Sequence, residues 1–138
     1  MSQLTKKTVE HLTTLYLNVA NSHDANRFGE IMAENYICYS RLGTIEGLAS
    51  YKQVMMGFYT AFPNMQFFLD ATVADGDTIV YHYHWTGTHQ QELMGIPATG
   101  KAVTVYGMEM NRVENGKIVE CWNYADQMSL MQQLGVIP

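Results

Sequence analysis

One acidic side chain, Glu109, stands in a stretch of otherwise apolar or small residues, VYGMEMN. A carboxylate in such surroundings is a candidate general base, because burial raises its pKa toward the pH at which an enzyme works. The alternative is a charge that points outward or joins an ion pair on a neighbouring strand. Buried carboxylates without a partner are rare unless they have a role, so Glu109 is kept as a candidate catalytic residue.

Two polar residues follow near the end of the next strand-like segment, Asn123 and Asp126, with Trp122 beside them. An amide takes no proton, so Asn123 can stabilise an enolate only by hydrogen bonding, and an Asn at a strand end is also an ordinary turn residue. Asp126 is expected to cap a helix by accepting the amide of Met128 or Ser129. A catalytic role for its carboxylate is the alternative. Together these residues predict the wall of a small-molecule pocket.

His82 and His84 lie at i and i+2 and therefore project from one face of their strand. This spacing is half of a metal site, and no further His, Cys or Asp residues stand at a matching spacing, so no metal is expected. Tyr81, Tyr83 and Trp85 share the opposite face. Alternation alone does not decide which face is concave, so both histidines and Trp85 are candidates for lining the cavity.

Two further residues are candidates for the cavity wall. Tyr16 shares a helical face with Leu12 and Val19, so its hydroxyl either enters a cavity or packs in the core. His89 is expected to hydrogen-bond the Gly- and Pro-containing segment from Gly95 to Gly100, whose backbone groups need partners. The sequence contains no GxGxxG, no P-loop and no nucleophile elbow. It therefore does not support dinucleotide binding, nucleoside triphosphate binding or hydrolysis by a nucleophilic Ser or Cys.

The elements that must position these residues follow from hydrophobic periodicity. Helical spacing predicts helices over Leu4–Asn21, Ala25–Met32, Leu48–Ala61 and Asp126–Leu134. Extended segments are predicted over Tyr36–Ser40, Thr44–Glu46, Met65–Ala74, Thr78–Thr88, Lys101–Val113 and Lys117–Tyr124. Asn115-Gly116 is a strong hairpin signal. This order predicts an α+β fold in which helices pack on one face of a curved, mainly antiparallel sheet and enclose a hydrophobic cavity.

Composition narrows the class of protein. The chain has 138 residues, of which 47% are hydrophobic and 15% charged, as in one globular domain over residues 1–138. A net charge of −5 argues against nucleic acid as a partner. No apolar run is long enough to span a membrane, and the N-terminus shows no signal peptide. Cys38 and Cys121 lie far apart and are expected to be reduced thiols of a cytoplasmic protein.

Several motifs carry a resemblance to a known family. They are the segments Thr86–His89, Met94–Lys101, Asn115–Glu120 and Gln132–Gly135, together with Trp122 and Asp126. In this order and spacing they resemble the SnoaL-like polyketide cyclases, an ester-cyclase-like family of the nuclear-transport-factor-2-like superfamily. The resemblance covers almost the whole chain. It implies a cone-shaped fold and a homodimer formed through the outer face of the sheet.

The resemblance also implies a reaction. Characterised cyclases of this family use an Asp near the end of the last strand and a His on the preceding strand for an intramolecular aldol closure that needs no cofactor. By spacing from the Asn115-Gly116 turn, the Asp position falls on Asn123 and the His position on Glu109. Both positions suit one inward face of neighbouring strands. The chain therefore departs from the family pattern at the two positions that carry the chemistry.

Three hypotheses follow. The leading one is a cofactor-free enzyme acting on a small apolar carbonyl compound, with Glu109 as base, Asn123 polarising the carbonyl and Asp126 as a supporting carboxylate. The second is a different reaction on the same fold, an isomerisation or an epoxide hydrolysis. An epoxide hydrolase would need an arginine, and Arg112, the one arginine near the site strands, is predicted to face away from Glu109. The third is a non-catalytic small-molecule-binding domain, which the presence of Asn123 favours.

Overall fold

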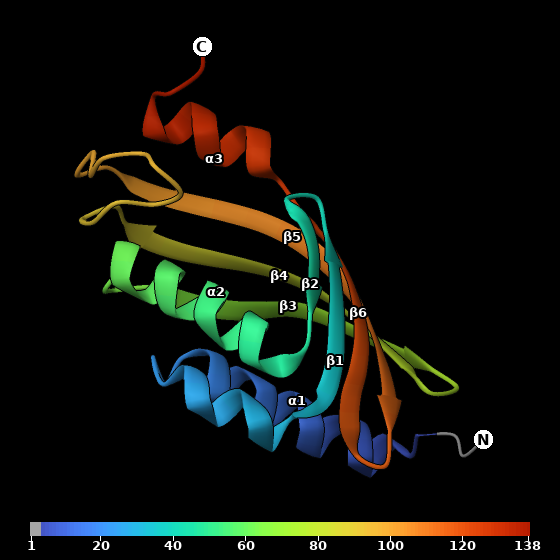
Figure 1. The fold of residues 1–138 in the computed structure, drawn as a ribbon. Coiled ribbons are helices and arrows are strands. Elements are labelled where there is room, and N and C mark those ends of the chain that lie inside the picture. Colours follow the sequence, from blue (N-terminus) through green and yellow to red (C-terminus); the bar gives the residue numbers. More distant parts are fainter. Residues whose placement is uncertain (1–3) are drawn as a thin grey trace.

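The computed structural model describes residues 4–138, which form a mixed α+β fold (Figure 1). The helices described are α1 (Lys6–Ala20), the short 3₁₀-helix η1 (Ala25–Glu30), α2 (Leu48–Ala61) and α3 (Gln127–Leu134). The strands are β1 (Met32–Ser40), β2 (Gly43–Glu46), β3 (Gln66–Asp75), β4 (Thr78–Thr88), β5 (Ala102–Glu114) and β6 (Lys117–Ala125). The predicted bounds of α2 and β4 are confirmed to the residue.

All six strands belong to one curved sheet with the spatial order β2-β1-β6-β5-β4-β3. Consecutive strands from β3 to β6 pair antiparallel, which confirms the predicted run of long hairpins. β1 pairs parallel to β6, a contact between distant parts of the chain that local periodicity does not reveal. Helices α1 and α2 lie on one face of this sheet, and α3 lies at its end (Figure 1). The predicted α+β architecture is therefore confirmed.

Short-range signals explain where several elements begin and end. Asn115 and Gly116 have φ angles of 51° and 75°, so the turn between β5 and β6 has the positive φ values that its sequence predicts. Asp126 caps α3 by accepting a hydrogen bond from the Ser129 amide at 3.0 Å. Gly135 ends α3 with a left-handed φ of 81°. These signals are local and were sufficient for prediction.

The segment after α1 differs from the prediction. A helix was expected over Ala25–Met32, but the chain forms only η1, and β1 begins at Met32 rather than at Tyr36. The reason is long-range, because Met32 already pairs with Ile118 of β6. Pairing with a distant strand overrides the helical spacing of this segment.

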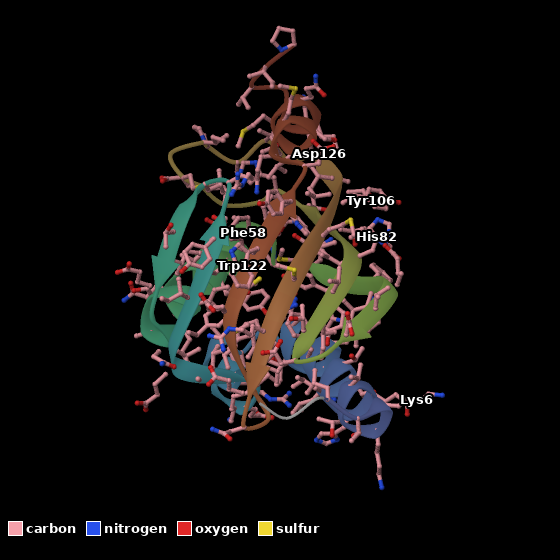
Figure 2. All side chains as sticks on the ribbon, turned by 90° about the vertical axis from the view of Figure 1, so that its right-hand side faces the viewer. Lys6, Phe58, His82, Tyr106, Trp122 and Asp126 are labelled. Carbon is pink, nitrogen blue, oxygen red and sulfur yellow. The ribbon has the colours of Figure 1, made fainter. Side chains whose placement is uncertain are left out.

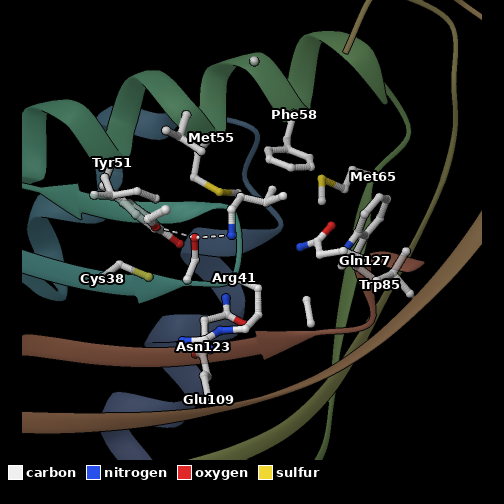
Figure 3. Close-up of a pocket in the computed structure, with 18 of the residues that line it drawn as sticks. Cys38, Arg41, Tyr51, Met55, Phe58, Met65, Trp85, Glu109, Asn123 and Gln127 are labelled. Atoms are coloured by element: carbon white, nitrogen blue, oxygen red, sulfur yellow. Dashed lines mark hydrogen bonds between the residues drawn. The ribbon is translucent and has the colours of Figure 1, made fainter. Parts of the chain in front are cut away.

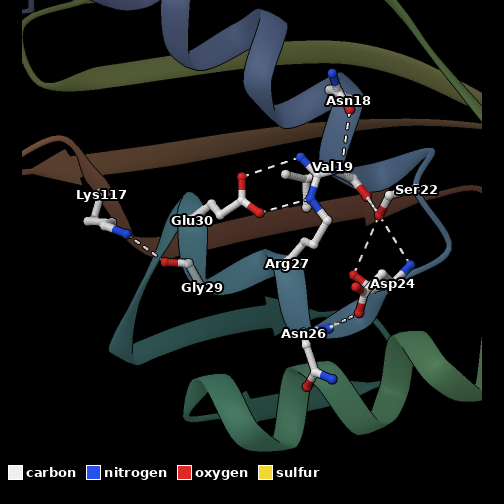
Figure 4. A network of polar contacts seen from close by, with 9 residues as sticks. All are labelled: Asn18, Val19, Ser22, Asp24, Asn26, Arg27, Gly29, Glu30 and Lys117. Atoms are coloured by element: carbon white, nitrogen blue, oxygen red, sulfur yellow. Dashed lines mark hydrogen bonds and ion pairs between the residues drawn. The ribbon is translucent and has the colours of Figure 1, made fainter.

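A network of polar contacts fastens η1 beside α1 and β6 (Figure 4). Asp24 caps η1 through the Asn26 amide at 3.1 Å, and Arg27 forms an ion pair with Glu30 at 2.8 Å. Lys117, at the start of β6, donates a hydrogen bond to the carbonyl of Gly29. The network thereby holds β6 in place next to η1, at the end of the β5–β6 hairpin.

Strand β3 breaks its predicted alternation. Phe67 and Leu69 face the interior as expected, but the register with β4 shifts between Leu69 and Ala71, where Asp70 is an extra residue. Such a bulge reverses the faces of the residues that follow. Val73, which an unbroken alternation would place on the same side as Phe67, is 64% exposed. No helix among residues 4–138 is long and apolar enough to cross a membrane.

Candidate active site

A cavity of about 440 Å³ lies between α2 and the concave face of the sheet (Figure 3). Most of its wall is apolar, with side chains from α2 and from β3, β4 and β5. The apolar and aromatic lining includes Tyr51, Met55, Phe58, Met65, Phe67, Trp85 and Val105. A small number of polar side chains enter this wall, among them Tyr16, Arg41, Tyr83, Glu109, Asn123 and Gln127. Such a pocket suits a small apolar ligand with few polar groups.

Glu109 is the buried acid of this cavity. Its side chain points inward because residues of β5 alternate strictly between buried and exposed, and Glu109 is only 6% exposed. Asn111 donates to its Oε1 at 3.4 Å, and the Cys121 thiol faces its Oε2 at 3.8 Å. Within residues 4–138 Glu109 forms no ion pair.

Burial raises the pKa of Glu109 above the usual range of a glutamate. Donor groups on Tyr16, Asn111 and Cys121 favour its ionised form and oppose part of this shift. Burial, together with the charge of Glu109, keeps the pKa of Tyr16 well above its ordinary value, so this phenol remains a proton donor. Tyr16 thus lies in the cavity wall, as the sequence suggested, and it faces the acid.

Asn123 lies directly across from Glu109, because the two are register partners on β5 and β6. The hydroxyl of Tyr83 donates to Asn123 Oδ1 at 2.8 Å. With its oxygen engaged in this way, the carboxamide presents its NH₂ group as the remaining donor. The arrangement places a hydrogen-bond donor beside a carboxyl group, on neighbouring strands of the same cavity wall.

Gly107 makes the contact between Tyr83 and Asn123 possible. Tyr83 on β4 must reach over β5 to touch β6, and Gly107 is its register partner on β5. A Cβ atom at position 107 would lie 2.5 Å from the Tyr83 hydroxyl oxygen. Any side chain at this position would therefore displace the phenol. Burial raises the pKa of Tyr83, which keeps it protonated as a donor.

The two histidines of β4 lie outside the cavity, contrary to the expectation that they contribute to its wall. Tyr83 and Trp85 face inward, so alternation places His82 and His84 on the outer face. His84 Nδ1 contacts Asp70 Oδ2 at 2.7 Å. His82 and Tyr106 lie next to each other over β4 and β5 (Figure 2). Trp85, on the buried side, is part of the cavity lining.

Three other predicted site residues have structural positions. Trp122 faces outward from β6 and stacks on Tyr39, with 5.6 Å between ring centroids. Asp126 serves as the N-cap of α3 and does not line the cavity. His89 is fully buried beside the cavity, where its Nδ1 accepts the Thr99 amide at 3.2 Å, as predicted for the Gly95–Gly100 segment. The expectation that Trp122 and His89 line the cavity is therefore not met.

Several cavity residues were missed by sequence reasoning. Tyr51 and Tyr83 could have been found from the faces of their elements, since each shares a face with other buried aromatic residues. Arg41 and Gln127 gave no signal, because a turn and a helix start bring them to the cavity from outside the strand pattern. Arg112 faces outward as predicted and binds Glu120. Arg41, and not Arg112, borders the cavity, and its guanidinium stacks over the ring of Tyr124, 4.5 Å from the ring centroid.

The side chains that commonly bind metal ions do not cluster in the part of the chain that the structure describes. Among residues 4–138 no three His, Cys, Asp or Glu side chains gather closely enough to hold an ion. The polar groups of the cavity lining are instead the carboxyl groups of Glu92 and Glu109, together with amides, hydroxyl groups, phenols, a thiol and a guanidinium. These groups can exchange a proton and hydrogen-bond an oxygen atom of a ligand.

Solved structures show where this fold recurs. TsrD from Streptomyces laurentii is 21% identical with a TM-score of 0.89, covering 98% of this chain and 100% of its own. AclR from Streptomyces galilaeus, proposed to be a hydroxylase, is 27% identical with a TM-score of 0.82 and covers 94% and 99%. IdmH from Streptomyces antibioticus, proposed to be a polyketide cyclase, is 26% identical with a TM-score of 0.79 and covers 91% and 97%.

The family of the chain is identified from its sequence. No curated protein matches this chain. The sequence model of a family described as SnoaL-like polyketide cyclase matches residues 10–134, which is nearly the whole chain and includes every polar residue of the cavity. The fold, the cavity and this match agree, and the chain belongs to the SnoaL-like polyketide cyclase family.

Proposed function

We propose that this protein is a cofactor-independent acid/base enzyme that abstracts a proton α to the carbonyl group of a small, apolar substrate. The observation that carries the proposal is the pairing of Glu109 with Asn123. A buried carboxyl group with no ion-pair partner among residues 4–138 lies beside a carboxamide donor on the neighbouring strand, in the wall of an apolar cavity. Membership of a polyketide cyclase family supports a carbonyl-bearing substrate.

Each step has a named group. The ionised Glu109 carboxylate accepts the proton from the carbon next to the carbonyl, and its raised pKa makes it a stronger base than an exposed glutamate. The electron pair moves onto the carbonyl oxygen, where the NH₂ group of Asn123 stabilises the enolate. Tyr83 holds the carboxamide in this orientation. Asp126 is left as the cap of α3, since its carboxylate already accepts the Ser129 amide.

The test follows proton exchange, which requires no knowledge of the natural product. The protein is incubated in D₂O with an apolar methyl ketone such as 2-acetylnaphthalene, and deuterium in the acetyl group is measured by mass spectrometry. Glu109→Gln is expected to lower the enzyme-dependent rate about 10²–10⁴-fold, the usual contribution of a general base. Glu114→Gln is the matched control, because Glu114 lies on the same strand but is exposed.

Two outcomes would contradict this proposal in different ways. An unchanged rate in Glu109→Gln would remove Glu109 as the base. If wild-type protein binds the ketone but never exchanges its protons, the chain is a binding domain rather than an enzyme. Ligand affinity is therefore measured for both proteins by the fluorescence of the bound naphthalene, since a lost base leaves binding intact.

The outer face of the sheet supports a homodimer. It exposes four large side chains on β5 and β6: Tyr106, Met108, Met110 and Tyr124, each more than 40% accessible. A contiguous patch of this kind is typical of an interaction surface. Met108→Asp is expected to shift the protein from dimer to monomer in sedimentation experiments, whereas a wild-type protein that is monomeric at every concentration would contradict the dimer.

The free thiols Cys38 and Cys121 suit the cytoplasm.

A further inference from the structure

The amide of Gln127 enters the cavity without a protein partner. Gln127 is the first residue of α3, and its side chain lies among those of Phe58, Met65 and Trp85 (Figure 3). Its Oε1 is completely buried, yet no group of residues 4–138 donates a hydrogen bond to it. Buried polar atoms are normally paired, so an unpaired amide in a cavity wall requires an explanation.

The backbone of Gln127 is held firmly, so the side chain is presented to the cavity by a fixed support. Asp126 donates its amide to the Tyr106 carbonyl at 2.9 Å and caps α3 through Ser129. Gln133 then pairs with the Thr104 backbone in both directions, at 2.8 and 2.7 Å. The backbone at Gln127 therefore keeps its position as long as α3 stays packed on β5.

Gln127 lies at the opposite end of the cavity from Glu109. Asn123 is the register partner of Glu109, and β6 continues beyond Asn123 before the chain turns into α3. Ala125, the last residue of β6, lies two residues past Asn123, roughly 7 Å along the strand, and Gln127 follows Ala125 by two residues. The cavity lining also includes Met55 and Phe58 from α2 and Val105 from β5, which offer apolar contacts to a ring system.

We infer that Gln127 binds a hydroxyl group at the end of the substrate that lies away from the carbonyl held by Asn123. A hydroxyl donates to the amide oxygen and accepts from the amide NH₂, so one group satisfies both atoms of the side chain. The substrate class is then a flat, mainly apolar ketone with a phenolic or enolic hydroxyl at its other end. This inference rests on the proposed function, which assigns the carbonyl end to Glu109 and Asn123.

The test compares two rigid ketones that differ only at the far end. 6-Hydroxy-2-acetylnaphthalene carries the hydroxyl across the ring system from its carbonyl, and 2-acetylnaphthalene lacks it. Wild-type protein is expected to bind the hydroxy ketone about 3- to 10-fold more tightly, the usual effect of one net hydrogen bond. Gln127→Met keeps the length of the side chain without its polar atoms, and it is expected to bind both ketones equally well.

Gln132→Leu is the control, because Gln132 lies on the same helix but is exposed. The control should keep the wild-type preference. Gln127→Met should unfold at the same temperature as wild type or higher, because it removes an unpaired buried group, so loss of preference cannot be ascribed to misfolding. If wild type shows no preference for the hydroxy ketone, or if Gln127→Met retains this preference, Gln127 does not bind the hydroxyl group.

The two proposals fail separately in this design. Deuterium exchange into 2-acetylnaphthalene depends on Glu109 and should survive Gln127→Met. If no protein exchanges deuterium while the preference for the hydroxy ketone is present and depends on Gln127, the catalytic proposal is wrong, but Gln127 still binds the hydroxyl group. If exchange depends on Glu109 but the preference is absent, Gln127 does not bind the hydroxyl group, and the catalytic proposal is retained.

Discussion

The concave and outer faces of the sheet contain the same kinds of polar side chain in different surroundings. On the concave face Glu109 is 6% exposed and has no cationic partner within residues 4–138. On the outer face Glu120, on the neighbouring strand, pairs with Arg112 at 2.7 Å. His84, also outside, pairs with Asp70 at 2.7 Å. The outer carboxylates of Glu120 and Asp70 therefore each have a partner.

This difference shows that residue type alone does not identify a catalytic group. In the sequence, the pair His82 and His84 suggests a chemical role more strongly than a single glutamate does, yet both rings stack on aromatic side chains of the outer face, His82 on Tyr106 and His84 on Phe68. Glu109 has the property that matters, because its charge would be buried without a counter-charge. The predictions below compare changes on the two faces, in order of decreasing effect.

Replacing Asn123 with leucine removes the donor on the concave face. Proton exchange with 2-acetylnaphthalene is expected to fall about 10²–10³-fold, since one donor to a developing oxyanion contributes that much. Affinity for the ketone should change little. Tyr124→Phe is the outward-facing control on the same strand and should keep the wild-type rate. An Asn123→Leu protein that exchanges at the wild-type rate would rule out the carboxamide as the stabilising group.

Removing the Tyr83 hydroxyl tests whether Asn123 needs to be held in place. Tyr83→Phe leaves Asn123 Oδ1 without its donor at 2.8 Å, so the carboxamide can rotate. The exchange rate is expected to fall about 3- to 10-fold, as for one lost hydrogen bond. In an Asn123→Leu background the same change should have no further effect. Fully additive losses in the double variant would show that Tyr83 acts independently of Asn123.

The pH dependence of stability follows from Glu109. Its pKa is raised in the folded protein, so its contribution to stability is complete below the pKa of the unfolded chain, about 4.3, and is lost as the pH rises through the folded value. Glu109→Gln removes this loss. Chemical denaturation should show the variant gaining stability relative to wild type between pH 4 and pH 8. Equal pH slopes in the two proteins would contradict a buried, titrating Glu109.

The outer face should tolerate a matched change. His84→Gln breaks the contact with Asp70, but partly exposed ion pairs contribute only about 0–1 kcal/mol to stability. The exchange rate should stay at the wild-type value, and the unfolding free energy should fall by less than about 1 kcal/mol. A large loss of exchange in this variant would show that the two faces are not separate in function.

Local signals in the sequence were sufficient for much of the fold. The helical period gave α2, the alternation gave β4, and the Asn115-Gly116 pair gave the last hairpin. The site was predicted less completely. Glu109, Asn123, Tyr16 and Trp85 are in the cavity wall, but alternation could not say which face of β4 is concave, because only packing against α2 decides it. Arg41 reaches the cavity from the turn between β1 and β2, and Gln127 from the first residue of α3, so the alternation of the strands places neither of them.

The parallel pairing of β1 with β6 has a consequence for how the protein folds. The backbones of Cys38 on β1 and Cys121 on β6 are register partners, so this wall of the cavity joins segments that are far apart in the chain. Hairpins between neighbouring strands form quickly, but such a distant pairing must first overcome the entropy of closing a long loop. During synthesis, β1 and α2 emerge from the ribosome well before β6. Until β6 is available, the apolar side chains of β1 and α2 cannot be fully buried. We expect β6 docking to be a late step in folding, with this half of the chain exposed until then.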